Sequence, residues 1–174
     1  IDFSKAGQSN RNAHISHGKN DMMDLGVTDR VAPLLQKVRV MINDEIAPLD
    51  GEFHAEVGKH PSGDRFKHTA RQLEILNGLK AKAKGRGLWN FWLTDSTRGY
   101  GLTTVEYAYL AEEMGKVTIA AEVFNCNAPD TGNMEVLERY GTQAHKDCWL
   151  GDLLEGKIRS CLLYTSDAAD DSDC

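Results

Sequence analysis

The sequence predicts an all-α domain, a bundle of five or six helices. Apolar residues recur at three- and four-residue steps through most of the chain, which is the spacing of one helix face. Capping residues precede these segments, and glycines follow them. No stretch before residue 157 has the alternation of a convincing strand. With 41% apolar and 26% charged residues, the composition is typical of one globular domain.

The first predicted helix runs from about Val27 to Pro48. Thr28 or Asp29 is the expected N-cap, because a short polar side chain can accept a bond from a free backbone N–H of the first turn. Pro48 is the expected end. The apolar residues of this segment form one stripe that must be buried: Val27, Val31, Leu34, Leu35, Val38, Met41, Ile42 and Ile46.

A loop rich in glycine, proline and histidine is expected over residues 49–69, followed by a helix around residues 71–87 that ends at Gly87. The expected buried face of this helix consists of Leu73, Leu76, Leu79 and Ala83. The connection over residues 87–103 carries two of the three tryptophans. Such a connection is either packed down by its rings or part of a surface that meets another domain.

A further helix should begin at Thr103, because Thr103 and Glu106 have the spacing of a capping box. This segment has almost no polar side apart from its three glutamates, so we expect a central helix. Glu112 and Glu113 point about 100° apart on a helix, which argues against paired catalytic carboxylates.

Two more helical segments follow. Asp130 is the expected cap of the first and Gly141 its stop, with Met134 and Leu137 directed inward. The second should be capped by Thr142 and ended by Gly156. Its expected packing residues are Trp149, Leu150, Leu153 and Leu154.

Charge and composition exclude several functions. The net charge of −6 and the absence of a block of lysine and arginine argue against a nucleic-acid partner. No apolar run approaches the roughly 20 residues of a membrane span, and no signal peptide is recognisable. Free thiols and a cytoplasmic location are expected, because no CxxC pair occurs among Cys126, Cys148, Cys161 and Cys174.

Two candidate sites are weak on spacing alone. No two of the histidines His54, His60 and His68 share a helical turn, and Asp64 does not complete a ligand set, so no metal site is expected. Cys126 has no local partner that would activate it, so it is expected to be a core thiol.

Three segments carry a resemblance to a known family: "GLWNFWL", "GLTTVEYAYLAEEMGKV" and "EVFNCNAPDTGNMEVLERYGTQAHKDCWLGDLLEGKIRS". They resemble the N-terminal helical domain of the acyl-CoA dehydrogenase family, most closely the branch that contains its human members ten and eleven. The resemblance covers about Met23 to Ser160. It implies α,β-dehydrogenation of acyl-CoA thioesters by FAD. The flavin-binding β-barrel and the C-terminal helical domain, which carries the catalytic base in most members, are missing from this sequence.

The resemblance also implies a substrate site, a cofactor and partners. Val123, Phe124, Asn127 and Ala128 would border the acyl chain, although Val123 and Phe124 could equally be plain core, and Asn127 a turn residue. No catalytic residue is expected here. FAD, acyl-CoA and electron-transfer flavoprotein would belong to the full-length parent, which the resemblance implies is a homo-oligomer. The chain alone should neither hold FAD nor be active.

Both ends of the chain read differently from the domain at residues 23–160. Residues 1–22 are expected to be a non-native or disordered leader before a start at Met23, or else a native extension. "CLLYTSDAAD" resembles translated sequencing-adapter DNA, so residues 161–174 are expected to be a foreign tail; a natural acidic tail is the alternative.

A free-standing helical interaction module is the alternative function, since a bundle does not fix function. The two accounts differ in expected burial. A domain separated from its partners should leave apolar residues more exposed than usual, and this is the expected result; a self-contained module should bury them. The residues concerned are Trp89, Phe91, Trp92, Val123 and Phe124.

Overall fold

The computed structural model describes residues 25–93 and 98–161, and every regular element within these ranges is helical. The predicted all-α fold is confirmed. The elements join into six continuous helices: α1 (Ala32–Met41) with the π-helical η1 (Ile42–Ile46) and α2 (Ala47–Ala55); α3 (Ala70–Gly85); α4 (Thr104–Met114); α5 (Ala120–Val123); α6 (Asp130–Tyr140); and α7 (Gln143–His145) with the π-helical η2 (Lys146–Leu150) and α8 (Gly151–Leu154).

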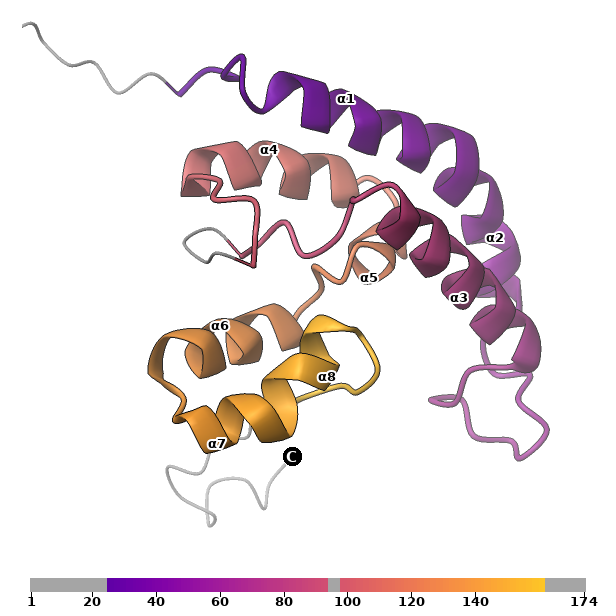
Figure 1. Ribbon diagram of the computed structural model, residues 1–174. Coiled ribbons are helices and arrows are strands. Elements are labelled where there is room, and N and C mark those ends of the chain that lie inside the picture. The colour runs from indigo at the N-terminus through magenta and orange to yellow at the C-terminus, as the bar shows by residue number, and fades with distance from the viewer. Residues whose placement is uncertain (1–24, 94–97, 162–174) are drawn as a thin grey trace, which may run out of the picture.

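The helices form an upper and a lower group (Figure 1). The long helix α1–η1–α2 arches over the top, with α4 packed beneath α1 and α3 packed against α2. Below them, α6 packs against η2 and α8. Helix α5 contacts both α3 and α4 and leads into α6, so the α5–α6 turn connects the two groups.

Pro48 does not end the first helix, contrary to the prediction. The helix continues to Ala55 because η1 widens the turn before the proline: the Ala47 N–H donates to the Ile42 carbonyl, five residues back. A π-turn makes room for a ring that would otherwise clash with the preceding turn. The loop therefore begins near Glu56, several residues later than expected. Thr28 does close the entry turn, since its hydroxyl accepts a bond from the Val31 N–H at 3.3 Å.

The start and end of α3 follow its sequence. Thr69 and Gln72 form a capping box, which the sequence reading overlooked. Gly87 has φ +67°, and the Leu88 N–H donates to the Ala83 carbonyl at 2.8 Å, which confirms the glycine C-cap. Leu73 was assigned to the wrong face: it is 45% exposed, and Gln72 is buried beside it.

Helix α4 begins with the predicted capping box of Thr103 and Glu106 but is not central. Thr104, Ala108 and Glu112, at i, i+4 and i+8, form an exposed stripe. The opposite side buries two carboxylates, Glu106 and Glu113, against the α1 segment. Burial of these charges requires partners, and arginines near α1 supply them.

Glu106 accepts bonds from the backbone N–H of Thr103 at 2.9 Å, from the Thr28 hydroxyl at 2.7 Å and from the Arg30 guanidinium at 2.7 Å. These bonds, the Thr103 N–H first among them, lower the pKa of Glu106 to about 2. Farther along the contact between α1 and α4, Arg39 Nε donates to Glu113 at 2.8 Å. This bond lowers the pKa of the Glu113 carboxyl as well. The two ion pairs fix α1 on α4.

The lower group departs from the prediction at two positions. Asp130 is the first residue of α6 and makes no cap bond to that helix; its carboxylate bonds to Arg159 and Ser160 instead. Trp149 is 48% exposed, while its neighbours Leu150 and Leu153 are buried as expected. The Thr142 cap and the Gly156 stop are confirmed, the latter with φ +67°.

The aromatic connection is packed down, which corrects the expected exposure. Phe91, Val123 and Phe124 are completely buried and Trp92 is 6% exposed; Trp89 is half-buried. The Phe91 and Phe124 ring centroids lie 5.4 Å apart, so the connection closes on the turn after α5. The exposed apolar side chains lie elsewhere, and those of the lower group are Val136, Tyr140, Trp149 and Ile158.

The expected leader (1–22) and all of the expected tail except Cys161 lie outside the described residues. Within the described ranges, no helix combines the length and the apolar character that crossing a membrane requires.

Candidate functional site

The four predicted site residues lie within residues 123–129, which comprise the last residue of α5 and the turn that leads into α6; this segment is called the turn below. Val123 and Phe124 are fully buried, Asn127 is half-buried and Ala128 is exposed. The structure therefore brings the four together in the chain but directs two of them into the core. Only the Asn127–Ala128 end of the turn reaches the surface.

The middle of this turn is held by two asparagines that the sequence reading did not single out. Asn90 and Asn125 both have a left-handed backbone, with φ +57° and +55°. The Asn125 side-chain amide donates to Asn90 Oδ1 at 2.7 Å and to the Leu153 carbonyl at 3.1 Å. The Asn90 N–H donates to the Phe124 carbonyl at 3.0 Å. Asparagine tolerates this backbone better than other residues with a side chain, and strained positions concentrate at functional sites.

The two ends of the turn are also tied down. Glu122 precedes it and Asp130 follows it, and the Arg159 guanidinium bonds to both carboxylates at 2.5 Å. Asp130 is 2% exposed and accepts two more bonds from Ser160. Residues 29 and 37 positions apart are joined here, so sequence spacing carried no signal of it.

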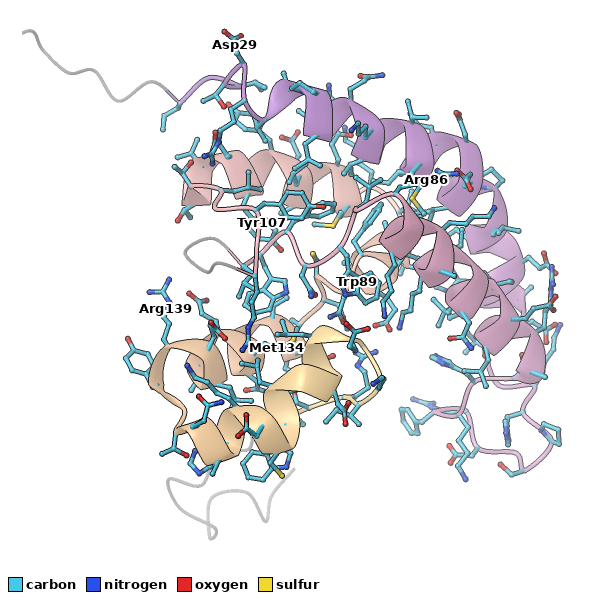
Figure 2. All side chains as sticks on the ribbon, in the orientation of Figure 1. Asp29, Arg86, Trp89, Tyr107, Met134 and Arg139 are labelled. Atoms are coloured by element: carbon cyan, nitrogen blue, oxygen red, sulfur yellow. The ribbon has the colours of Figure 1, made fainter. Side chains whose placement is uncertain are left out.

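A cavity of about 460 Å³ lies between the start of α4 and α6, next to this turn. Thr131 and Gly132, which directly follow the turn, form part of its wall, and Arg139 pairs with Glu135 at 2.8 Å farther along α6. Figure 2 shows Tyr107 on the side of α4 that faces the lower helices and Arg139 on the outer side of α6. The opposite wall includes Trp92, Thr103, Thr104 and Tyr107.

The cavity is lined by the charged pair Glu135 and Arg139 and otherwise by neutral groups, among them the Tyr107 phenol. Burial raises the pKa of Tyr107 above its ordinary range, and it raises the pKa of Cys126, which bonds to that phenol, to about 12. The indole N–H of Trp92 is buried and has no hydrogen-bond partner among the described residues. Neutral hydroxyl, indole and aliphatic groups suit a largely apolar ligand with few polar atoms.

The starts of the helices bear on where a flavin could bind. A dinucleotide pyrophosphate is commonly bound at a free helix N-terminus. The starts of α3 and α4 are closed by their own capping boxes, and the buried carboxylate of Asp130 stands at the start of α6, whereas the start of α1 has no side-chain cap bond. No group of three or more potential metal ligands occurs within residues 25–93 and 98–161 either.

Comparison with known proteins decides the family. The sequence profile of the family described as Acyl-CoA dehydrogenase, N-terminal domain, matches residues 28–157. The chain belongs to the acyl-CoA dehydrogenase family. It is 43% identical over 153 residues to acyl-CoA dehydrogenase family member 10 of Mus musculus, and 48% identical over 141 residues to member 11 of Homo sapiens.

The fold agrees with this assignment. A solved structure from Mycobacterium abscessus, of a protein assigned to the acyl-CoA dehydrogenases, superposes with a TM-score of 0.68 at 44% identity. The match covers 85% of this chain and 37% of that one. The matched region takes up 85% of this chain but 14% of the mouse protein, and 80% of this chain but 17% of the human protein. The chain thus spans a small part of its curated relatives.

Proposed function

We propose that this chain supplies one wall of the acyl-chain pocket in a flavin-dependent acyl-CoA dehydrogenase. The wall consists of the turn at residues 123–129 and the adjoining cavity between α4 and α6. The observation that carries the proposal is that the turn leads, through Asp130, into the Thr131–Gly132 part of the cavity wall, although no residue of the turn itself lines the cavity.

Within this wall the residues have different roles. Asn127 and Ala128 reach the surface and would contact the acyl chain directly. Val123 and Phe124 would act from beneath, because they are buried and fix the position of the turn. A preformed wall lowers the entropic cost of binding a flexible chain.

The chemistry belongs to the longer protein. In the proposed parent, bound FAD would supply hydride acceptance, a carboxylate of the longer protein would remove the α-proton, and electron-transfer flavoprotein would take up the electrons. This chain aligns the acyl group and excludes water from one side. Because the family resemblance places flavin binding and the catalytic base in other domains, we expect the 174-residue chain alone to hold no FAD and to be inactive.

A fluorescence titration tests the proposal on this chain. Octanoyl-CoA should change the emission of Trp92 saturably, whereas CoA without an acyl group should not. Gly132→Phe places a ring at the cavity wall and should weaken binding about tenfold or more, since a Cβ at Gly132 meets nothing within 4 Å. Gly78→Phe on α3 is the matched control, a helical glycine with equally open surroundings outside this cavity. Binding that is independent of the acyl group or unchanged by Gly132→Phe would overturn the proposal.

The alternative is a helical protein-interaction module. The burial of Phe91, Trp92, Val123 and Phe124 is the observation in its favour, because a self-contained module should bury these side chains. Its contact surface would be the exposed apolar side chains of the lower helices. An interaction module would bind no acyl-CoA in the titration.

A further inference from the structure

The turn at residues 123–129 is flanked by one acidic residue on each side, and a single arginine reaches both. Arg159 NH1 lies 2.5 Å from Glu122 Oε2, and Arg159 Nε lies 2.5 Å from Asp130 Oδ2. The flat guanidinium presents donors in fixed directions, so it can join two carboxylates at a set separation. All four predicted site residues lie between these two carboxylates in the sequence.

Burial shows which end of this bridge is the firmer. The side chain of Asp130 is 3% exposed, that of Glu122 is 18% exposed, and that of Arg159 is 51% exposed. Asp130 Oδ1 also accepts the Ser160 N–H at 2.6 Å and the Ser160 hydroxyl at 2.7 Å. A buried carboxylate persists only when it is paired and hydrogen-bonded, so the Asp130 end is fully engaged.

The Glu122 end connects the bridge to the upper helices. Lys80 of α3 forms an ion pair with the other oxygen of Glu122, and both side chains are mostly buried. The turn is thus held between α3 on one side and the segment at residues 159–160 on the other. Asn133 of α6 adds a bond to the Ser160 hydroxyl at 2.9 Å.

From this geometry we propose that Arg159 is a positioning residue of the acyl-binding wall. By fixing the separation of Glu122 and Asp130, it sets the shape of the turn between them and hence the surface that Asn127 and Ala128 present. This role rests on the proposed function of the turn. It makes the segment at residues 159–160 part of the substrate site, although Arg159 itself contacts no acyl group.

Another arginine offers a matched control. Arg71 also bridges two carboxylates, Glu52 at 2.7 Å and Glu74 at 2.8 Å, and its side chain is 42% exposed. It joins α2 to α3, away from the turn. Removal of either arginine deletes one double ion pair, but only the loss of Arg159 should change the turn.

The first measurement is hydrogen exchange on the 174-residue chain. The N–H groups of Phe124, Asn125 and Cys126 are bonded to backbone carbonyls and report on the turn. In Arg159→Ala these amides should exchange about tenfold faster or more, while those of α2 and α3 stay unchanged; Arg71→Ala should leave the turn amides unchanged. In Arg159→Lys the same amides should also exchange faster than in wild type, because a single ammonium cannot replace the guanidinium donors that reach both carboxylates. Unchanged exchange in Arg159→Ala would overturn the proposal.

The second measurement is the octanoyl-CoA titration of the same variants. Arg159→Ala should bind at least fivefold more weakly than wild type, and Arg71→Ala should bind equally well even where its melting temperature falls as far. If the turn amides of Arg159→Ala exchange faster but octanoyl-CoA binds as tightly as to wild type, Arg159 only stabilises the fold and the positioning role is refuted. If wild type itself binds no octanoyl-CoA, the proposed function fails and the positioning role with it, whatever the exchange result.

Glu122→Gln guards against a variant that does not fold. It releases the more exposed end of the bridge and leaves Asp130 paired with Arg159 and Ser160. The same faster exchange and weaker binding are expected, to a smaller degree, and the absence of both would contradict the proposal.

Discussion

Replacing Glu106 by glutamine should remove one of the two ion pairs that join the α1 segment and α4 and leave the other, Arg39–Glu113, in place. The pKa of Glu106 is lowered from 4.5 to about 2 by the Thr103 N–H, the Thr28 hydroxyl and Arg30. By linkage, a displacement of this size corresponds to about 3 kcal/mol of folding free energy. Because the folded pKa is the lower one, this stability is complete above pH 4.5 and is lost as the pH falls towards 2.

Urea unfolding followed by circular dichroism at several pH values measures the effect. At pH 7, Glu106→Gln should be less stable than wild type by about 2–3 kcal/mol, and the gap should narrow steadily below about pH 4.5. Glu112→Gln, at an exposed position of the same helix, controls for the change of residue type and should stay within about 0.5 kcal/mol of wild type. A gap between wild type and Glu106→Gln that does not depend on pH would refute the assigned cause.

Three further outcomes are expected. Gly156→Ala should lower the free energy of unfolding by about 1–3 kcal/mol, because φ is +67° and the new Cβ would lie 3.1 Å from the Trp89 ring; Gly78→Ala should not destabilise. Asn125→Ala should cost about 2–4 kcal/mol in thermal unfolding through the loss of its buried amide bonds and its left-handed backbone. In a thiol-labelling time course at pH 8, Cys148 and Cys161 should react quickly and Cys126 only on unfolding, because Cys126 is buried and its pKa is about 12; equal rates would contradict its placement.

Helix boundaries set by local chemistry could be predicted from the sequence. The Thr103–Glu106 capping box, the Thr142 cap, and the stops at Gly87 and Gly156 all depend on residues within one or two turns. The prediction that Pro48 ends the first helix was wrong. A proline usually breaks a helix through its own ring and missing N–H, but here the π-turn over residues 42–46 accommodates the ring and the helix continues.

Burial of the aromatic connection could not be predicted in the same way. It depends on Asn90 bonding across the fold to Phe124 and Asn125, 34 and 35 positions away in the sequence. Periodicity describes one helix at a time and carries no information about such pairs. For the same reason, Asp130 was expected to cap α6, although a distant arginine takes up its carboxylate.

The candidate site could likewise be predicted only in part. Family resemblance indicated the turn that contains Val123, Phe124, Asn127 and Ala128, but not which of these reach the surface. The supports of the turn, Asn125 and Arg159, became visible only once the chain was folded.

Residue-resolved NMR shifts during an octanoyl-CoA titration test the central claim most directly. We predict that the amides of Asn127, Ala128, Thr131 and Gly132 shift saturably, because they belong to the turn and the cavity wall. CoA alone should leave these amide shifts unchanged. Neither octanoyl-CoA nor CoA should shift the amides of the loop at residues 56–69. Shifts confined to the exposed side chains of the lower helices, or no shifts at all, would contradict the assignment of this turn as an acyl-binding wall.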